Sequence, residues 1–121
     1  MDRQTPPRFV VLEHDHPFVH WDLMLEAGAA LRTWRLAAPP SAGAEAEATP
    51  LGEHRRLYLD YEGPVSGDRG RVARWDHGTF AWEGQGEGLV LVRLDGARLR
   101  GLLRLWRVTA ESWRASFEPT P

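Results

Sequence analysis

Short runs of alternating polar and apolar residues constrain the fold of this chain more than any other feature. Gly, Pro or Asp separates the runs, as in EAGAA, EGQGEG and LDG. Alternation with a period of two is the pattern of a β-strand with one buried face. We therefore predict strands over residues 8–14, 19–26, 31–36, 55–61, 71–76, 79–83, 88–94, 97–108 and 112–118.

Strands at this spacing predict an all-β fold, either an antiparallel barrel or a sandwich. With 121 residues the chain is long enough for one core and too short for two, so we expect residues 1–121 to form a single domain. The stretch AAPPSAGAEAEATP (37–50) predicts a surface loop with a short edge strand toward its end. We expect the core to be filled by the tryptophans at positions 34, 75, 82 and 106.

The composition excludes several classes of protein. Cysteine is absent, which excludes disulfide frameworks and thiolate metal sites. The opening MDRQTPPRF lacks the apolar run of a signal peptide and no stretch approaches a membrane span, so we expect a soluble, cytoplasmic monomer. All fifteen basic residues are arginine, which either a GC-rich genome or phosphate recognition by guanidinium groups would produce.

The segment EHDHPFVHWDLMLE (13–26) combines metal-binding side chains with core-type ones. Side chains two apart on a strand share a face, so His20 and Asp22 project together, about 7 Å apart along the strand. A bend at DHPFV returns His14 to the side of His20. Two imidazoles and one carboxylate then form a three-ligand site with open positions, suited to Mn²⁺, Zn²⁺ or Fe²⁺. His16 lies in the bend and is expected to face solvent.

The same alternation assigns the faces of this strand. Trp21, Leu23 and Leu25 form the expected core face, and Met24 shares the other face with the metal-binding residues.

A second polar cluster lies in GEHRRLYLDYEG (52–63). His54, Arg56 and Tyr58 share strand parity there, a pattern that also fits a solvated strand face. His77, in WDHGTF, is expected in a turn. The sequence contains no Gly-rich phosphate loop and no Gly-x-Ser-x-Gly elbow, so a metal-activated water is the expected nucleophile if the protein is a hydrolase.

These residues carry a family resemblance. FVVLEHDHPFVHWDLMLE resembles the opening signature of the 3'-phosphoesterase domain of bacterial DNA ligase D, F-V-[VI]-x-x-H-x-x-x-x-x-[LV]-H-[YW]-D-[LF]-R-L-E. The match continues in order through ALRTWRLAAPPS, EHRRLYLDYEG, RVARWDHGTF and LDGARLRGLLRLWRV, over about residues 8 to 117. The resemblance implies a small closed antiparallel β-barrel of about eight strands.

The resemblance also implies an activity and its partners. Enzymes of this family trim 3'-phosphate or 3'-ribonucleotide ends so that DNA can be sealed. The implied partners are DNA or DNA/RNA 3' ends and a DNA ligase or polymerase of an end-joining pathway. His14, His20 and Asp22 stand where the family binds a divalent metal, usually manganese. His54 occupies the place of a phosphate-contacting histidine and Tyr58 that of the active-site tyrosine, which makes both catalytic candidates.

The arginines complete the implied site. Arg32 falls where the family carries a basic residue beside the pocket. The family's arginine two residues after the metal-binding aspartate is Met24 here, and its lysine before the Pro-Ser corner is Ala38. Arg35 and Arg56 are the candidates to replace the missing charge, so the predicted substrate-binding residues are Arg32, Arg35 and Arg56.

Two other functions stay open on the sequence alone. Met24 and Ala38 stand where the family has basic residues, so the chain has less charge for binding phosphate. It therefore also fits a module that binds DNA ends or a repair partner without turnover. His20-x-Asp22 with a distant histidine is in addition the pattern of an iron facial triad in oxygenases. Residues 27–53 show no cosubstrate-binding arginine at a defined spacing, however.

Overall fold

The computed structural model describes residues 5–121, in which the regular structure consists of β-strands and one short 3₁₀ helix. In this range no helix is long and apolar enough to span a membrane. The elements are β1 (Arg8–His14), β2 (His20–Ala27), β3 (Ala30–Leu36), β4 (Glu45–Arg55), the 3₁₀ helix η1 (Arg56–Leu59), β5 (Gly63–Pro64), β6 (Arg71–Gly86), β7 (Leu89–Gly96), β8 (Arg100–Arg107) and β9 (Trp113–Pro119).

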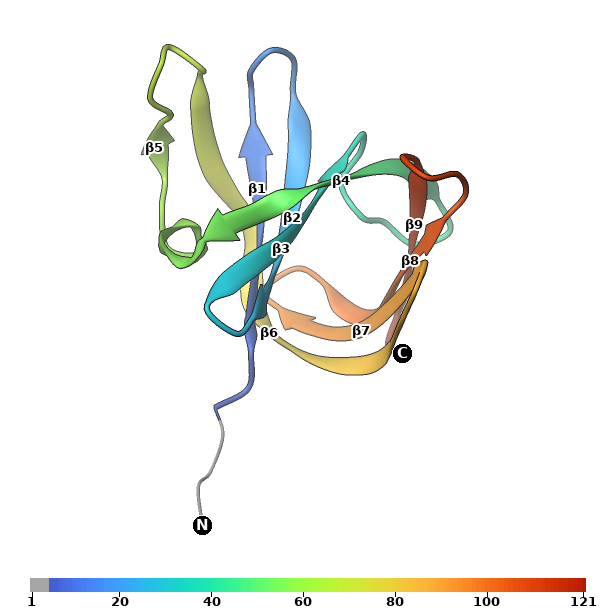
Figure 1. Ribbon diagram of the computed structural model, residues 1–121. Helices are drawn as coiled ribbons and strands as arrows, with labels where there is room; N and C mark the ends of the chain where they lie inside the picture. The colour runs from blue at the N-terminus through green and yellow to red at the C-terminus, as the bar shows by residue number, and fades with distance from the viewer. Residues whose placement is uncertain (1–4) are drawn as a thin grey trace.

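One antiparallel sheet closes on itself. The strand order is β1-β2-β3-β4-β9-β8-β7-β6-β5, and β1 also pairs with β6, so eight strands form a barrel-like ring (Figure 1). All of these strand pairings are antiparallel. Closure leaves the eight strands of the ring without a free edge. The prediction of an all-β, closed antiparallel architecture of about eight strands is confirmed.

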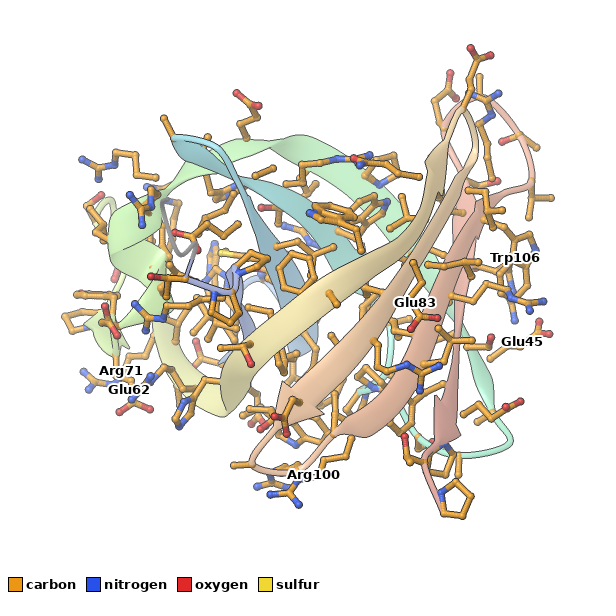
Figure 2. The ribbon with its side chains drawn as sticks, turned by 90° about the horizontal axis from the view of Figure 1, so that it is seen from below. Glu45, Glu62, Arg71, Glu83, Arg100 and Trp106 are labelled. Carbon is orange, nitrogen blue, oxygen red and sulfur yellow. The ribbon has the colours of Figure 1, made fainter. Side chains whose placement is uncertain are left out.

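The inside of the ring holds the main core. Trp34 and Trp113 meet there edge to face, with their ring centroids 5.7 Å apart. Trp75 and Trp82 are partly buried against the same cluster, as predicted. The prediction is wrong for Trp106, which is half-buried and shares the outer face of β8 with exposed Arg104. Figure 2 shows Trp106 on the opposite side of the molecule from Arg71 and Glu62.

A second apolar cluster lies on the outer face of β1–β3. Its buried members are Val10, Leu12, Met24, Leu31, Leu59 and Val72. Residues 56–70, which contain η1 and β5, cover this face and contribute Tyr58, Tyr61 and Val65 to its packing. The face that carries Met24 is therefore covered along part of its length, and Met24 itself is only 2% exposed.

The predictions for residues 37–61 are wrong in two places. Residues 45–55 form the long strand β4, which pairs with β3 and β9 and completes the ring. Its sequence lacks a strand pattern because Ala48 is its only fully buried side chain, and pairing with both neighbours overrides the weak local preference. Residues 56–59 form η1 rather than part of a strand over 55–61.

The predicted break at His77 is also absent. β6 continues through this residue, which pairs with Val10 of β1. The same strand pairs with β1 through its first half and with β7 through its second half. Gly78 lies at this crossing, where a Cβ atom would collide with the backbone of Asp95 and Gly96. His77 is therefore an exposed mid-strand residue and not a turn residue.

Asp76 fixes the connection between β7 and β8. Its side chain is 1% exposed, and its carboxylate accepts hydrogen bonds from the backbone N–H groups of Arg98 and Leu99, each at 2.9 Å. Gly96 packs against this carboxylate so closely that a Cβ atom there would overlap it. Asp76 thus supplies the acceptors that the turn backbone lacks.

We predict that Asp76→Ala lowers the free energy of unfolding by about 2–4 kcal/mol, because two largely buried N–H donors lose a charged acceptor. Asp76→Asn keeps one acceptor oxygen, so its free energy of unfolding should lie between those of the wild type and Asp76→Ala. Urea denaturation measures the effect, with Asp95→Ala as the control because this neighbouring side chain is largely exposed. Equal stability of Asp76→Ala and the wild type would contradict the assignment.

Candidate active site

The β1–β2 hairpin brings the predicted metal ligands together. His14 ends β1 and His20 begins β2, and the two residues are direct cross-strand partners. Their ring centroids lie 4.8 Å apart. Asp22 projects from the same outer face, and one ligand atom from each of the three residues lies within 4.8 Å of the others. The predicted return of His14 to the side of His20 is confirmed.

Backbone carbonyl groups orient both imidazoles. His14 Nε2 lies 2.7 Å from the Arg69 carbonyl oxygen, and His20 Nδ1 lies 3.0 Å from that of Phe18. A carbonyl only accepts, so each of these nitrogens carries the proton and donates it. His14 Nδ1 and His20 Nε2 are left as lone-pair donors, 3.9 Å and 3.4 Å from the two Asp22 oxygens. Histidine ligands of metals commonly have this arrangement.

The atoms that face one another here are suited to a cation. Within the described residues, His20 Nε2 and Asp22 Oδ1 are buried without a hydrogen-bond partner. Leaving such groups unpaired is costly, whereas a divalent cation between them would satisfy both. Two imidazole nitrogens and one carboxylate form a donor set that fits Mn²⁺, Fe²⁺ or Zn²⁺.

A cavity of about 150 Å³ opens over this group, between the outer face of β1–β4 and the covering residues 56–70. Met24 and other apolar side chains line part of its wall. Its polar lining consists of His14, Asp22, Arg35, His54, Tyr58 and Arg69. The cavity therefore joins a potential metal site to two cationic side chains and two proton donors.

His54 and Tyr58 reach the cavity from consecutive elements. His54 lies near the end of β4 and Tyr58 on η1, with ring centroids 6.1 Å apart. The 3₁₀ turn, and not the strand parity used for the prediction, brings the two side chains to the same place. His54 Nδ1 donates to the Gly52 carbonyl at 2.8 Å, which leaves Nε2 free for a ligand.

Of the three predicted arginines, the structure brings Arg35 alone to the cavity. Its Nε lies 4.0 Å from Asp22 Oδ1. Arg32 lies on the inner face of β3, over the Trp34 ring and 3.0 Å from the Gln85 side-chain oxygen, and burial lowers the pKa of its guanidinium. Arg56 forms an ion pair with Glu26 outside the cavity lining.

Arg69 is a cavity residue that the sequence analysis missed. It lies in the turn between β5 and β6, where its side chain donates to the Ser66 carbonyl at 2.7 Å and to the Ser66 hydroxyl at 3.2 Å. Its own carbonyl orients His14. The stretch SGDRG signals only a turn, so no sequence pattern connects Arg69 with His14, 55 residues earlier.

Comparison with known proteins gives a consistent family assignment. The family model described as the DNA Ligase D 3'-phosphoesterase domain matches residues 12–107. The Multifunctional non-homologous end joining DNA repair protein LigD of Mycobacterium tuberculosis is 31% identical over 116 residues, covering 88% of this chain and 15% of that protein. The Multifunctional non-homologous end joining protein LigD of Pseudomonas aeruginosa is 30% identical over 112 residues, covering 83% of this chain and 13% of that protein.

The chain thus spans about 15% of the length of the curated relatives that it matches, the portion that corresponds to one of their domains. The match includes the candidate ligands, the cavity residues and most strands of the ring. The chain belongs to the DNA ligase D 3'-phosphoesterase domain family.

Proposed function

We propose that this chain is a metal-dependent phosphoesterase that removes a 3'-phosphate or a 3'-ribonucleotide from DNA ends during repair. Membership of the family supports a role in DNA end repair. The main support for the proposal is the pair of buried, unpaired atoms His20 Nε2 and Asp22 Oδ1, which group with His14 beside a cavity of about 150 Å³ that His14 and Asp22 line. DNA or DNA/RNA 3' ends are the proposed substrates, and a ligase or polymerase of an end-joining pathway is the proposed partner.

His14 Nδ1, His20 Nε2 and the Asp22 carboxylate are the atoms that would hold the metal, with Mn²⁺ as the proposed ion. A bound divalent cation supplies Lewis-acid polarisation of a phosphoryl oxygen and lowers the pKa of a coordinated water. The two backbone carbonyls hold the imidazoles in the tautomers that this role needs.

The other cavity residues have separate tasks. The Arg35 guanidinium binds non-bridging phosphate oxygens, for which its planar donors are well suited. In its imidazolium form His54 carries a proton on both ring nitrogens, so that Nδ1 keeps its bond to the Gly52 carbonyl while Nε2 gives its proton to the departing 3' oxygen as a general acid. The Tyr58 hydroxyl donates a hydrogen bond to the same phosphate. The apolar wall, which includes Met24, restricts the access of bulk water.

The arginine positions favour catalysis over the alternative of a non-catalytic binding module. That alternative depends on the charge lost at Met24 and Ala38. Met24 is a buried packing residue in this chain, and Arg35 and Arg69 both line the cavity from other elements. Positive charge is therefore present beside the candidate metal ligands, although it does not come from β2.

We predict that His20→Ala reduces the metal-dependent release of phosphate from a 3'-phosphorylated primer-template on the order of 100-fold or more, because one ligand is lost. Chelation of the wild type should have a similar effect, and added Mn²⁺ should reverse it. Calorimetric titration should show weakened Mn²⁺ binding by the variant. His77→Ala is the matched control, since it removes an exposed histidine outside the cavity. Activity that survives both His20→Ala and chelation would exclude the proposed reaction.

We predict that Arg35→Gln lowers kcat for the same substrate by about 10²–10³-fold, because a cationic donor to the transferred phosphate is removed. Its Mn²⁺ affinity should change little, since Arg35 is not a ligand. Arg104→Gln, an exposed arginine on β8, is the control for a general loss of positive charge. If both variants lose activity equally, Arg35 has no specific role in the site.

A further inference from the structure

The tip of the β1–β2 hairpin (residues 15–19) presents an exposed aromatic ring beside the candidate metal site. Phe18 is 75% exposed, and the adjacent Val19 is exposed as well. A phenylalanine in this position does not gain the stabilisation that burial of such a side chain provides. Packing within the described part of the chain does not account for this ring, which points to an external contact.

The backbone of the hairpin tip is anchored although the Phe18 ring is free. The Phe18 carbonyl accepts the His20 Nδ1 proton at 3.0 Å. The Asp15 carboxylate accepts a hydrogen bond from the Arg71 backbone N–H at 2.8 Å. The tip therefore holds Phe18 in a defined place beside a candidate metal ligand.

The tip also meets the turn between β5 and β6. Figure 1 shows these two hairpin ends reaching in the same direction, side by side. They touch at Gly70, where an added Cβ atom would overlap the Asp15 carboxylate and lie 2.7 Å from His16 Cβ. The neighbouring Arg69 lines the cavity. The two hairpin ends thus form one continuous rim.

The rim has the composition of a surface that holds an unpaired nucleotide. Phe18 and His16 supply aromatic rings, and the His16 ring centroid lies 6.4 Å from that of His14. Arg69 supplies a guanidinium. Aromatic rings that stack on bases, together with cations that track the phosphates, are how proteins bind single-stranded nucleic acid. Phe18 is two residues from His20, and its carbonyl oxygen lies 3.0 Å from His20 Nδ1, so the ring is close enough to the site for a base attached to a phosphate in the cavity to reach it.

We infer that Phe18 is the stacking platform for the terminal nucleobase of the strand whose 3' phosphate enters the cavity. This inference rests on the proposed function and narrows its substrate class. The terminal base must leave its partner to stack on Phe18, so the site prefers 3' ends whose last base is unpaired. A fully paired end must first open, which costs unstacking energy.

Fluorescence anisotropy with labelled 3'-phosphorylated single strands, in the presence of Mn²⁺, tests the inference. One strand carries an intact last base and the matched strand an abasic last nucleoside. The wild type should bind the intact strand about 5- to 100-fold more tightly, the range expected for one stacked base. Phe18→Ala should lose most of this preference, whereas Phe18→Trp should keep it. Val108→Ala is the control, because Val108 is 59% exposed in the connection between β8 and β9.

The outcomes separate this inference from the proposed function. Equal base preference in Phe18→Ala and the wild type would overturn the inference. The exposed Phe18 ring would then be assigned to a contact with another protein. Phosphate release without a base preference would have the same consequence while leaving the phosphoesterase proposal intact. A base preference that depends on Phe18, without phosphate release, would support the inference and exclude the reaction. Failure of the wild type to bind either strand would overturn the inference, whereas the phosphoesterase proposal is decided separately by phosphate release from the primer-template.

Discussion

The antiparallel register between β1 and β2 is the constraint on which the rest of the site depends. It sets His14 directly opposite His20 and leaves Asp22 two residues along the same face. A slip by one residue would turn all of these side chains to the opposite face of the sheet. The register is secured because both faces of these strands are buried, one inside the ring and the other under residues 56–70. The same apolar residues that close the ring thus determine where the polar ligands converge.

The covering residues 56–70 are held down by charged side chains outside the cavity. Arg8 forms an ion pair with Asp60 at 2.6 Å, and its guanidinium lowers the pKa of that carboxyl. Glu26 accepts the Arg8 backbone N–H with one oxygen at 2.9 Å and pairs with Arg56 through the other. Arg56, predicted to bind substrate, thus lies where it anchors η1, the element that carries Tyr58. Packing and ion pairs together fix the covering residues 56–70 over the cavity.

How much could be predicted from the sequence differs between the fold and the site. Alternation located β1 and β2 and the shared face of His20 and Asp22, because the period of two is a property of the extended backbone. It did not reveal β4, whose partners on both sides impose a strand on residues with little apolar pattern. Strand pairing of this kind is non-local and leaves a weak trace in the local sequence.

For the arginines, too, local alternation predicts some positions and non-local contacts determine the others. In residues 31–36, alternation puts Arg32 on the same face of the strand as Trp34 and Leu36, which lie in the core. It puts Arg35 on the opposite face. Applied to this strand, the rule that found the metal ligands also distinguishes the two arginines. The role of Arg56 depends on Glu26, 30 residues away, and that of Arg69 on how a turn lies over His14. Contacts of this kind follow from the closed fold, so a sequence motif alone does not show them.

We propose that His14, His20 and Asp22 hold a metal beside an arginine that binds phosphate. Anomalous diffraction at the manganese edge, from crystals grown with Mn²⁺ and inorganic phosphate, tests it most directly. We expect one strong peak bonded to His14 Nδ1, His20 Nε2 and the Asp22 carboxylate, with phosphate between this peak and the Arg35 guanidinium. A manganese peak elsewhere, or phosphate bound without contact to Arg35, would contradict it.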